Sequence, residues 1–409
     1  MKYEKFINNY FLILFSLIPI TILIGSAFSV INILLIDISF IILILYNKDF
    51  SFIKSKPIIV LFGLYIYLML NSFISIDFET GFLRNFGFLR IIILFAAFNY
   101  FYFRNYFYKK LFKFCLVPIL IVLIDVLIES YTGRNLLGFG EEYGKRIVSF
   151  FKDEPIVGGY LNGFFLIIIG FLLNEFKSKK KYVFIILLLS FLFVFEIILT
   201  GERSNSIKAF IALVFFLFLF KDANIKVRLL LLIASLAIIF ITIVSSPSLK
   251  YRYFKQTHKI IKENNNYFAL YNSGFEVFKN HKMFGVGNKN YREEACQDEN
   301  KLNEQQINKY VCSNHPHQIY FELLSEHGFI GSLLILLIFY VLIFSKFKET
   351  LKTKNYLKLG TFIYMVLVFL PLLPSGAFFN NYLITIFSIN LSLFYASDKK
   401  MNIFYNDKF

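Results

Sequence analysis

Long, predominantly apolar stretches constrain the fold of this chain more than any other feature of its sequence. Residues 31–46, 182–200 and 229–244 are three of them, and a helix needs about 20 such residues to cross about 30 Å of hydrocarbon. The chain is 57% hydrophobic and 17% charged, which is more apolar surface than one soluble core would bury. The sequence therefore predicts an all-α membrane protein whose remaining apolar surface faces lipid.

About twelve transmembrane helices are expected, and an even number places both termini on one side of the membrane. Every segment predicted on that side is basic, as the positive-inside rule requires of cytoplasmic loops. Most of the net charge of +16 therefore reports orientation, with both termini cytoplasmic, and gives no reason to expect nucleic-acid binding. The first run, 11–24, could instead be a signal peptide, but removing it would leave an odd number of spans. The expected spans are 8–26, 28–46, 58–76, 86–103, 112–130, 156–175, 182–200, 205–220, 229–245, 317–344, 360–376 and 379–396.

The chain is expected to form a single polytopic domain over residues 1–409, because it shows no internal repeat and no soluble segment. Two of the predicted non-cytoplasmic loops are long: 131–155, and 245–316 between the ninth and tenth spans. We call the second one the large loop. Its segment 250–262 interleaves apolar with basic residues, which predicts a helix on the membrane surface. Binding and catalytic residues concentrate in long loops, so the chemistry is expected on the non-cytoplasmic face.

Two of the three cysteines, Cys296 and Cys312, fall in the large loop. The compartment outside the cytoplasm favours disulfides, and a bond that closes about 15 residues stabilises a fold by about 3 kcal/mol. We therefore predict a disulfide between them. The neighbouring His315 and His317 would also allow Cys312 to be drawn into a zinc site, although two histidines two positions apart on a helix point to different sides.

The segment 313–318 precedes a long apolar run and is typical of a helix start. Asn314 or His315 would be the N-cap and Pro316 the first helical residue, which places His317 in the first turn. The positive end of the helix dipole disfavours an imidazolium there. A neutral His317 could then accept a proton near neutral pH.

Two glycines, Gly328 and Gly331, follow later in the same predicted helix. They lie eleven and fourteen residues after His317, so at about 100° per residue the three residues would share one helix face. Glycines three apart let membrane helices pack closely, which would aim the histidine into a crevice of the bundle. The alternative is a histidine that only caps the helix or rests at the membrane interface.

Arginines are few on the predicted outer side, and two of them come directly before a predicted helix or its capping turn. Arg146 precedes the sixth span, whose start is marked by Asp153, and Arg203 lies in the turn between the seventh and eighth spans. Guanidinium binds diphosphate oxygens well, although either residue alone could be an interfacial anchor. Arg90 lies inside the fourth span, where a buried charge is costly and functional by default; snorkelling to the interface is its alternative.

The order of these motifs resembles the O-antigen ligase and O-antigen polymerase superfamily of bacterial inner-membrane glycosyltransferases. His317 and Gln318, followed after nine residues by Gly328 and Gly331, match the histidine motif of that family in full. The weaker matches are Arg146 with 158–161, the turn 200–204 with Glu202 in place of a small residue, and the Gly-Val-Gly at 285–287. The sequence contains no Asp-x-Asp, no phosphate-binding loop and no Gly-x-Ser-x-Gly elbow, which favours a metal-free site built from arginine and histidine.

The resemblance implies an O-antigen ligase-like enzyme of the bacterial inner membrane with its active site facing the periplasm. It would move a glycan from undecaprenyl diphosphate to an acceptor hydroxyl of the lipid A core, with inversion and without a cofactor. Arg146 and Arg203 would bind the diphosphate, and His317 would be catalytic. Further candidates for the site are Arg90, His315, Gln318 and Arg292. The family's large-loop arginine has no clear counterpart, and Arg252, Arg292 or Lys279 could take its role.

Two alternative functions stay open at this point. A polymerase of O-antigen or exopolysaccharide repeat units, from the same superfamily, would share these motifs. A polysaccharide or lipid flippase, or another transporter, is an alternative of a different class, because many transporters are polytopic helical bundles. Transporters line their path with charges near the midplane of the membrane, whereas the charges here cluster at the predicted outer face.

Overall fold

Helices form all the regular secondary structure of the computed structural model, which describes residues 2–104, 106–140, 146–152, 154–258, 266–296 and 310–405. No β-strand occurs in these ranges, which confirms the predicted all-α fold. The elements of the first half are α1 (Lys2–Ile24), α2 (Ser26–Asn47), η1 (Ser51–Lys54), α3 (Lys56–Ser72), α4 (Phe78–Phe86), α5 (Leu89–Phe101), α6 (Phe107–Thr132), η3 (Ser149–Phe151), α7 (Val157–Phe176) and α8 (Lys180–Leu199). Those of the second half are α9 (Arg203–Leu219), α10 (Ile225–Ser245), α11 (Pro247–Lys250), η4 (Tyr251–Lys255), α13 (Asn266–Asn280), α14 (Tyr291–Ala295), α16 (Ile319–Phe344), α17 (Phe347–Lys352), α18 (Tyr356–Val368) and α19 (Asn381–Ala396).

Eight helices within the described ranges are long and apolar enough to cross a membrane, judged by length and composition. Three shorter apolar helices, α3, α18 and α19, accompany them. Each predicted span overlaps a helix of the structure, with ends that differ by several residues. The chain is therefore a multi-pass membrane protein. The count of twelve crossings and the cytoplasmic position of both termini stay predictions.

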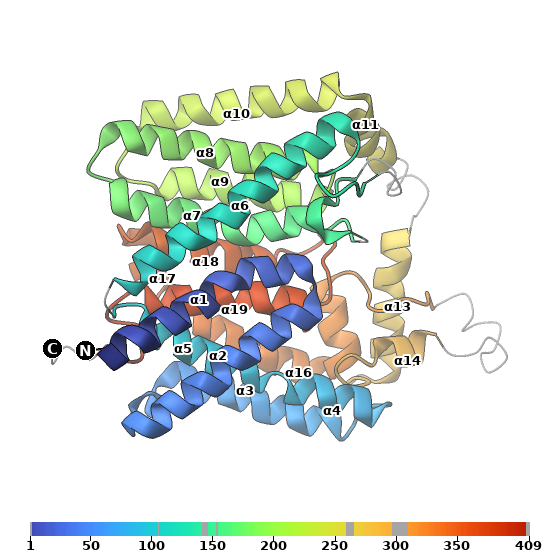
Figure 1. Cartoon of the computed structure of the whole chain (residues 1–409). Helices are drawn as coiled ribbons and strands as arrows, with labels where there is room; N and C mark the ends of the chain where they lie inside the picture. Colours follow the sequence, from blue (N-terminus) through green and yellow to red (C-terminus); the bar gives the residue numbers. More distant parts are fainter. Residues whose placement is uncertain are drawn as a thin grey trace.

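The helices of the large loop gather at one end of the bundle, which we call the loop end. Figure 1 shows α11, α13 and α14 at the right of the view, whereas α17 and the start of α1 lie at the left. The predicted surface helix at 250–262 corresponds in part to α11 and η4. Its residues 259–262 lie outside the described ranges, as does Asp153.

The centre of the bundle is formed by α7 where it packs against α18, and 83% of the span of α7 is buried. A Cβ atom on Gly170 would lie 2.5 Å from the backbone oxygen of Tyr356, and one on Gly360 would lie 2.6 Å from that of Leu166. Any side chain at either glycine would therefore push the two backbones apart. The close contact makes α7 and α18 one rigid pair, on which the site described below is built.

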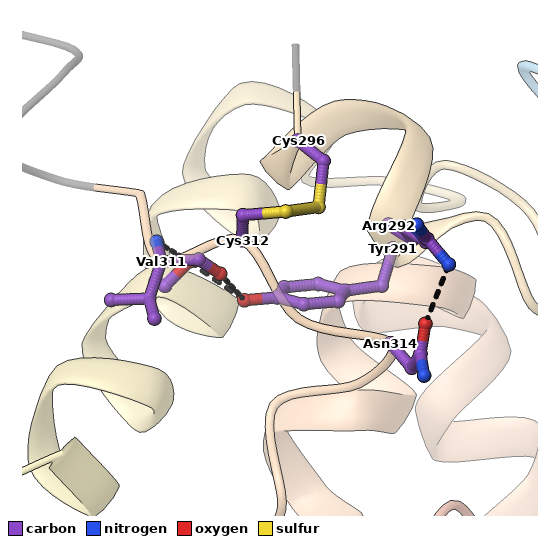
Figure 2. The surroundings of a disulfide bond; sticks show 7 residues. Tyr291, Arg292, Cys296, Val311, Cys312 and Asn314 are labelled. Atoms are coloured by element: carbon purple, nitrogen blue, oxygen red, sulfur yellow. Dashed lines mark hydrogen bonds between the residues drawn. A yellow bond between two sulfur atoms is a disulfide. The ribbon is translucent and has the colours of Figure 1, made fainter.

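The predicted disulfide between Cys296 and Cys312 is present, with the two Cα atoms 4.5 Å apart (Figure 2). Because both sulfurs are bonded to each other, Cys312 cannot ligate a metal together with His315 and His317. No group of three or more histidine, cysteine, aspartate or glutamate residues that could hold a metal ion occurs within the described ranges. The disulfide takes the place of the zinc site that the sequence allowed through Cys312.

Hydrogen bonds around the disulfide hold the end of the large loop against α13 and α14. The Tyr291 hydroxyl donates to the backbone oxygen of Val311 at 3.3 Å, and Arg292 donates to Oδ1 of Asn314 at 3.0 Å (Figure 2). The Val311 N–H donates to the hydroxyl of Ser273 at 3.0 Å. The chain is thus fixed at several points immediately before the two histidines.

A break in α16 at Gly328 joins that helix to the large loop. Gly328 has φ 63° and ψ −169°, a combination that is essentially restricted to glycine. The loop backbone fills the break: Phe329 N–H donates to the oxygen of Lys282 at 2.7 Å, and Val286 N–H donates to the oxygen of Ser325 at 2.9 Å. Backbone groups that the break would leave unpaired are therefore satisfied by the loop.

Two predictions made from the sequence for this helix are wrong. The helix begins at Ile319 and not at Pro316, so His317 precedes it. Because the helix is also interrupted at Gly328, the rule of about 100° per residue does not apply across it, and His317 does not share a helical face with Gly328 and Gly331. The glycines have separate contacts: a Cβ on Gly328 would meet the loop backbone, and one on Gly331 would lie 1.8 Å from the hydroxyl of Tyr67 in α3.

Candidate functional site

A cavity of about 680 Å³ lies at the loop end of the bundle, within the size range of small-molecule binding sites. The starts of α7 and α9, the end of α18, η4 and the segment before α16 surround it. The cavity brings together three residues singled out in the sequence, Arg146, Arg203 and His317. Its basic and histidine side chains are Arg146, Arg203, Lys208, Arg252, His315 and His317.

Three half-buried arginines give the cavity a positive lining. Arg146 donates to the backbone oxygen of Pro155 at 2.7 Å, and Arg203 donates to the hydroxyl of Thr257 at 3.1 Å. Arg252 donates to the backbone oxygen of Gly201. None of the three forms an ion pair with a carboxylate in the described part of the chain. Their positive charge is therefore available to an anion.

Arg252 has the most unusual environment of the three. Burial lowers the pKa of its guanidinium to about 10, and repulsion from Arg146 and Arg203 acts in the same direction. The guanidinium stays protonated at neutral pH, and it lies close enough to Arg146 and Arg203 for their positive charges to affect its pKa. Of the three basic residues proposed for the missing large-loop arginine, only Arg252 lines the cavity. Lys279 pairs with Glu276 at 2.7 Å, and Arg292 bonds Asn314 outside it.

Two carboxylates of α6 brace the segment that carries Arg146. Asp125 accepts a hydrogen bond from the hydroxyl of Ser149 at 2.5 Å, and Glu129 accepts from the N–H groups of Val148 and Ser149 at 2.9 and 2.7 Å. Carboxylates that accept backbone N–H bonds form strong contacts when buried. They hold the backbone two residues after Arg146 against the bundle.

Glu202 caps the start of α7 from the turn between α8 and α9. Its carboxylate accepts hydrogen bonds from Gly158 N–H at 2.6 Å, from Gly159 N–H at 3.2 Å and from the Asn205 amide at 2.7 Å. These backbone donors would otherwise be unpaired at the positive end of the helix. Burial raises the pKa of Glu202, whereas the charge of Arg146 and these hydrogen bonds oppose the rise. The cap fixes Arg203, the next residue, over the same cavity.

His317 lies directly before α16 in a strained backbone conformation. Its φ is 55°, in the left-handed region that costs a non-glycine residue about 1–2 kcal/mol. Its N–H donates to Nδ1 of His315 at 2.9 Å, and its backbone oxygen accepts from Ser375 N–H at 2.8 Å. These two bonds hold the strained residue in place. Strain that the surroundings enforce is a common property of functional sites.

The surroundings of His315 and His317 favour the neutral form of both imidazoles. Burial lowers the pKa of His317 below its ordinary value. Burial, followed by the nearby His317 and Lys289, lowers the pKa of His315 to about 3. Nδ1 of His315 is already an acceptor for a backbone N–H. His317 is therefore the better candidate for taking a proton from a substrate.

The remaining sequence candidates lie outside the cavity. Gln318 is the N-cap of α16, where its side chain accepts from the N–H groups of Tyr320 and Phe321 at 2.7 and 3.1 Å. Arg90 donates to Oδ1 of Asn381 at 2.8 Å, next to the start of α19. Neither residue is among those that line the cavity. Both therefore have structural contacts that explain their positions.

Two residues of the cavity were not recognised in the sequence. Lys208 lies within an apolar stretch of α9, and a lysine inside such a stretch is a signal of function that the sequence did offer. The capping role of Glu202 had no such signal, because its partners Gly158 and Gly159 lie more than 40 residues earlier in the chain.

Comparison with known proteins agrees with the geometry. A family model described as O-antigen ligase matches residues 188–336, a region that holds Arg203, Arg252 and His317 and excludes Arg146. No curated protein matches the chain. The family match falls on the same turn, large loop and histidine segment as the motifs singled out in the sequence, and it supports the resemblance of this region to the O-antigen ligase and polymerase superfamily.

Proposed function

We propose that this protein is an O-antigen ligase-like glycosyltransferase that moves a glycan from undecaprenyl diphosphate to an acceptor hydroxyl. The observation that carries the proposal is the meeting of three guanidinium groups with a half-buried histidine in one cavity at the loop end. A diphosphate leaving group requires positive charge, and an acceptor hydroxyl requires a base. The match of residues 188–336 to a family model described as O-antigen ligase supports a diphosphate-linked donor and a hydroxyl acceptor.

Arg146, Arg203 and Arg252 are proposed to bind the diphosphate. Guanidinium groups form paired, charge-assisted hydrogen bonds with phosphate oxygens. Three of them reduce the negative charge that develops on the leaving group when its bond to the sugar breaks, which is the main electrostatic requirement of such a reaction. Arg252 takes the place of the family's large-loop arginine in this scheme.

His317 is proposed to act as the general base. The acceptor oxygen attacks the anomeric carbon of the donor sugar and forms a new C–O bond, while the bond from that carbon to the phosphate oxygen breaks. The hydroxyl proton passes to His317, and the electron pair of the broken bond leaves with undecaprenyl diphosphate. Attack from the face opposite to the diphosphate inverts the configuration. A neutral imidazole, favoured by the burial of His317, is the form that this step requires.

The cavity is proposed to face the periplasm, with the protein in the bacterial inner membrane and the lipid A core as acceptor. The basic segments on the side of the termini support this orientation, since Figure 1 shows α17 and the start of α1 at the end opposite the large loop. A cofactor or metal ion is not part of the scheme.

Transfer by the purified full-length protein tests the proposal. Undecaprenyl diphosphate carrying a radiolabelled glycan is supplied with lipid A core, and labelled product is measured. His317→Ala and Arg203→Ala are each expected to lower the rate at least about 100-fold, the scale of a lost general base or charge stabiliser. Arg104→Ala removes an exposed arginine that does not line the cavity; it is the matched control and is expected to keep the wild-type rate. A chelator is expected to have no effect.

Three other outcomes would contradict this scheme. Wild-type transfer by both cavity variants would refute the assigned roles. Product made of joined repeat units without lipid A core would identify the polymerase reaction of the same superfamily. Movement of lipid-linked glycan across a vesicle membrane without any new glycosidic bond would identify a transporter.

A further inference from the structure

The cavity continues from its arginines into the apolar interior along one face of α9. Ser204, Lys208 and Ala212 line it at intervals of four residues, the spacing that keeps side chains on one helical face. At about 1.5 Å per residue, Ala212 lies about 13 Å along the helix from its first residue, Arg203. The apolar residues Leu166 of α7 and Leu367 of α18 line the cavity as well. The cavity therefore has a charged mouth and a partly apolar floor.

Lys208 is the cation nearest to that floor. Its side chain is only 8% exposed, and it forms no hydrogen bond or ion pair with any residue in the described ranges. A buried ammonium without a partner is costly, and ionisable residues inside membrane helices mark ligand paths as a rule. Because Lys208 lines the cavity, a partner for this charge can bind there.

We propose that Lys208 binds the phosphate that is attached directly to the lipid, while the arginines bind the phosphate attached to the glycan. This assignment rests on the proposed function and deepens it. A polyprenyl diphosphate keeps its chain in the hydrocarbon and its glycan in water, so its two phosphates lie at different depths. Lys208 lies five residues, or about 7.5 Å of helix, deeper than Arg203. The deeper cation therefore meets the phosphate next to the lipid.

The compact ammonium of lysine suits this position. Its flexible stem lets the charge reach upward from the apolar wall of α9, and it binds phosphate as a point charge without requiring a fixed plane. The lipid chain would continue downward past Ala212 and Leu166, which line the same cavity.

Binding of two lipids to the purified full-length protein separates the two phosphate positions. Undecaprenyl monophosphate carries only the lipid-attached phosphate, whereas undecaprenyl diphosphate carries both. Lys208→Met is expected to lower the affinity for both lipids about tenfold, which corresponds to about 1.4 kcal/mol. Arg203→Ala is expected to lower the affinity for the diphosphate about tenfold and the affinity for the monophosphate less than twofold. Lys208→Arg keeps the cation and is expected to stay within threefold of wild type for both.

Lys181→Met is the matched control, because it removes an exposed lysine from the start of α8 and is expected to change neither affinity. Methionine is close to lysine in length and is apolar, so Lys208→Met is expected to keep the wild-type melting temperature. A folding defect would therefore be visible separately from a binding defect.

The outcomes distinguish this inference from the function on which it rests. If Lys208→Met binds both lipids as wild type does while Arg203→Ala loses the diphosphate, Lys208 is not a phosphate ligand and the proposed function stands. If Lys208→Met weakens only the diphosphate, the lysine contacts the glycan-side phosphate and the assignment is wrong. If Arg203→Ala and Arg252→Ala also bind both lipids normally, the diphosphate site itself is refuted.

Discussion

Replacing Gly328 by alanine should detach the large loop from α16. A residue other than glycine at φ 63° and ψ −169° costs about 1–3 kcal/mol in backbone strain. The new Cβ would lie 2.4 Å from the carbonyl carbon of Met283 and from the nitrogen of Phe284, and forcing a methyl group into a packed contact costs about 1–3 kcal/mol more. The midpoints of these two costs add to about 4 kcal/mol, which raises the equilibrium constant for local opening about 1,000-fold.

Hydrogen–deuterium exchange of the full-length protein measures this opening directly. The amides of Val286 and Phe329 donate across the contact between the loop and α16. Peptides that contain them should exchange two to three orders of magnitude faster in Gly328→Ala, because the free energy of local opening falls by about 4 kcal/mol. Gly63→Ala is the control, since Gly63 lies in α3 with no heavy atom within 4 Å of its Cβ position. Equal exchange in the two variants would refute the view that this glycine holds the loop.

Two further predictions concern the walls of the cavity. Glu202→Gln keeps the shape of the cap but leaves only one oxygen acceptor for the donors at Gly158, Gly159 and Asn205, so thermal unfolding should show a loss of about 1–3 kcal/mol; an unchanged melting curve would show that the charge is not needed. Burial lowers the pKa of His317, and a general base must be neutral to accept a proton. If His317 is the base as proposed, the acid limb of the transfer rate should have its midpoint below the ordinary histidine value of about 6.5. A midpoint above that value would contradict the assignment of His317 as a buried base.

Local and compositional features of the sequence predicted much of this structure. Apolar runs predicted the helices, because a membrane leaves the backbone few other ways to satisfy its hydrogen bonds. The disulfide followed from two cysteines in one outer loop. Arg146, Arg203 and His317 were predicted from their positions beside helix starts, and the structure brings all three to one cavity.

Features that depend on contacts between distant segments were missed. The start of α16 was placed three residues too early, because Pro316 is a good first helical residue locally, whereas Ser375 bonds the backbone of His317 and holds it in a left-handed conformation. The break at Gly328 is satisfied by the loop backbone near Met283, some 45 residues earlier. Such pairings are set by tertiary packing, and local propensity carries no information about them.

The three cavity arginines come from three separate parts of the chain: the loop before α7, the start of α9, and η4 in the large loop. Their like charges repel one another: burial is the main cause of the lowered pKa of Arg252, and repulsion from Arg146 and Arg203 lowers it further. Under the proposed function, a diphosphate bound between them would reverse the sign of that interaction and would act as a non-covalent cross-link among the three segments. The proposed donor lipid would then complete the wall of its own binding site, and the rim of the cavity would be most rigid when the sugar is in place to react.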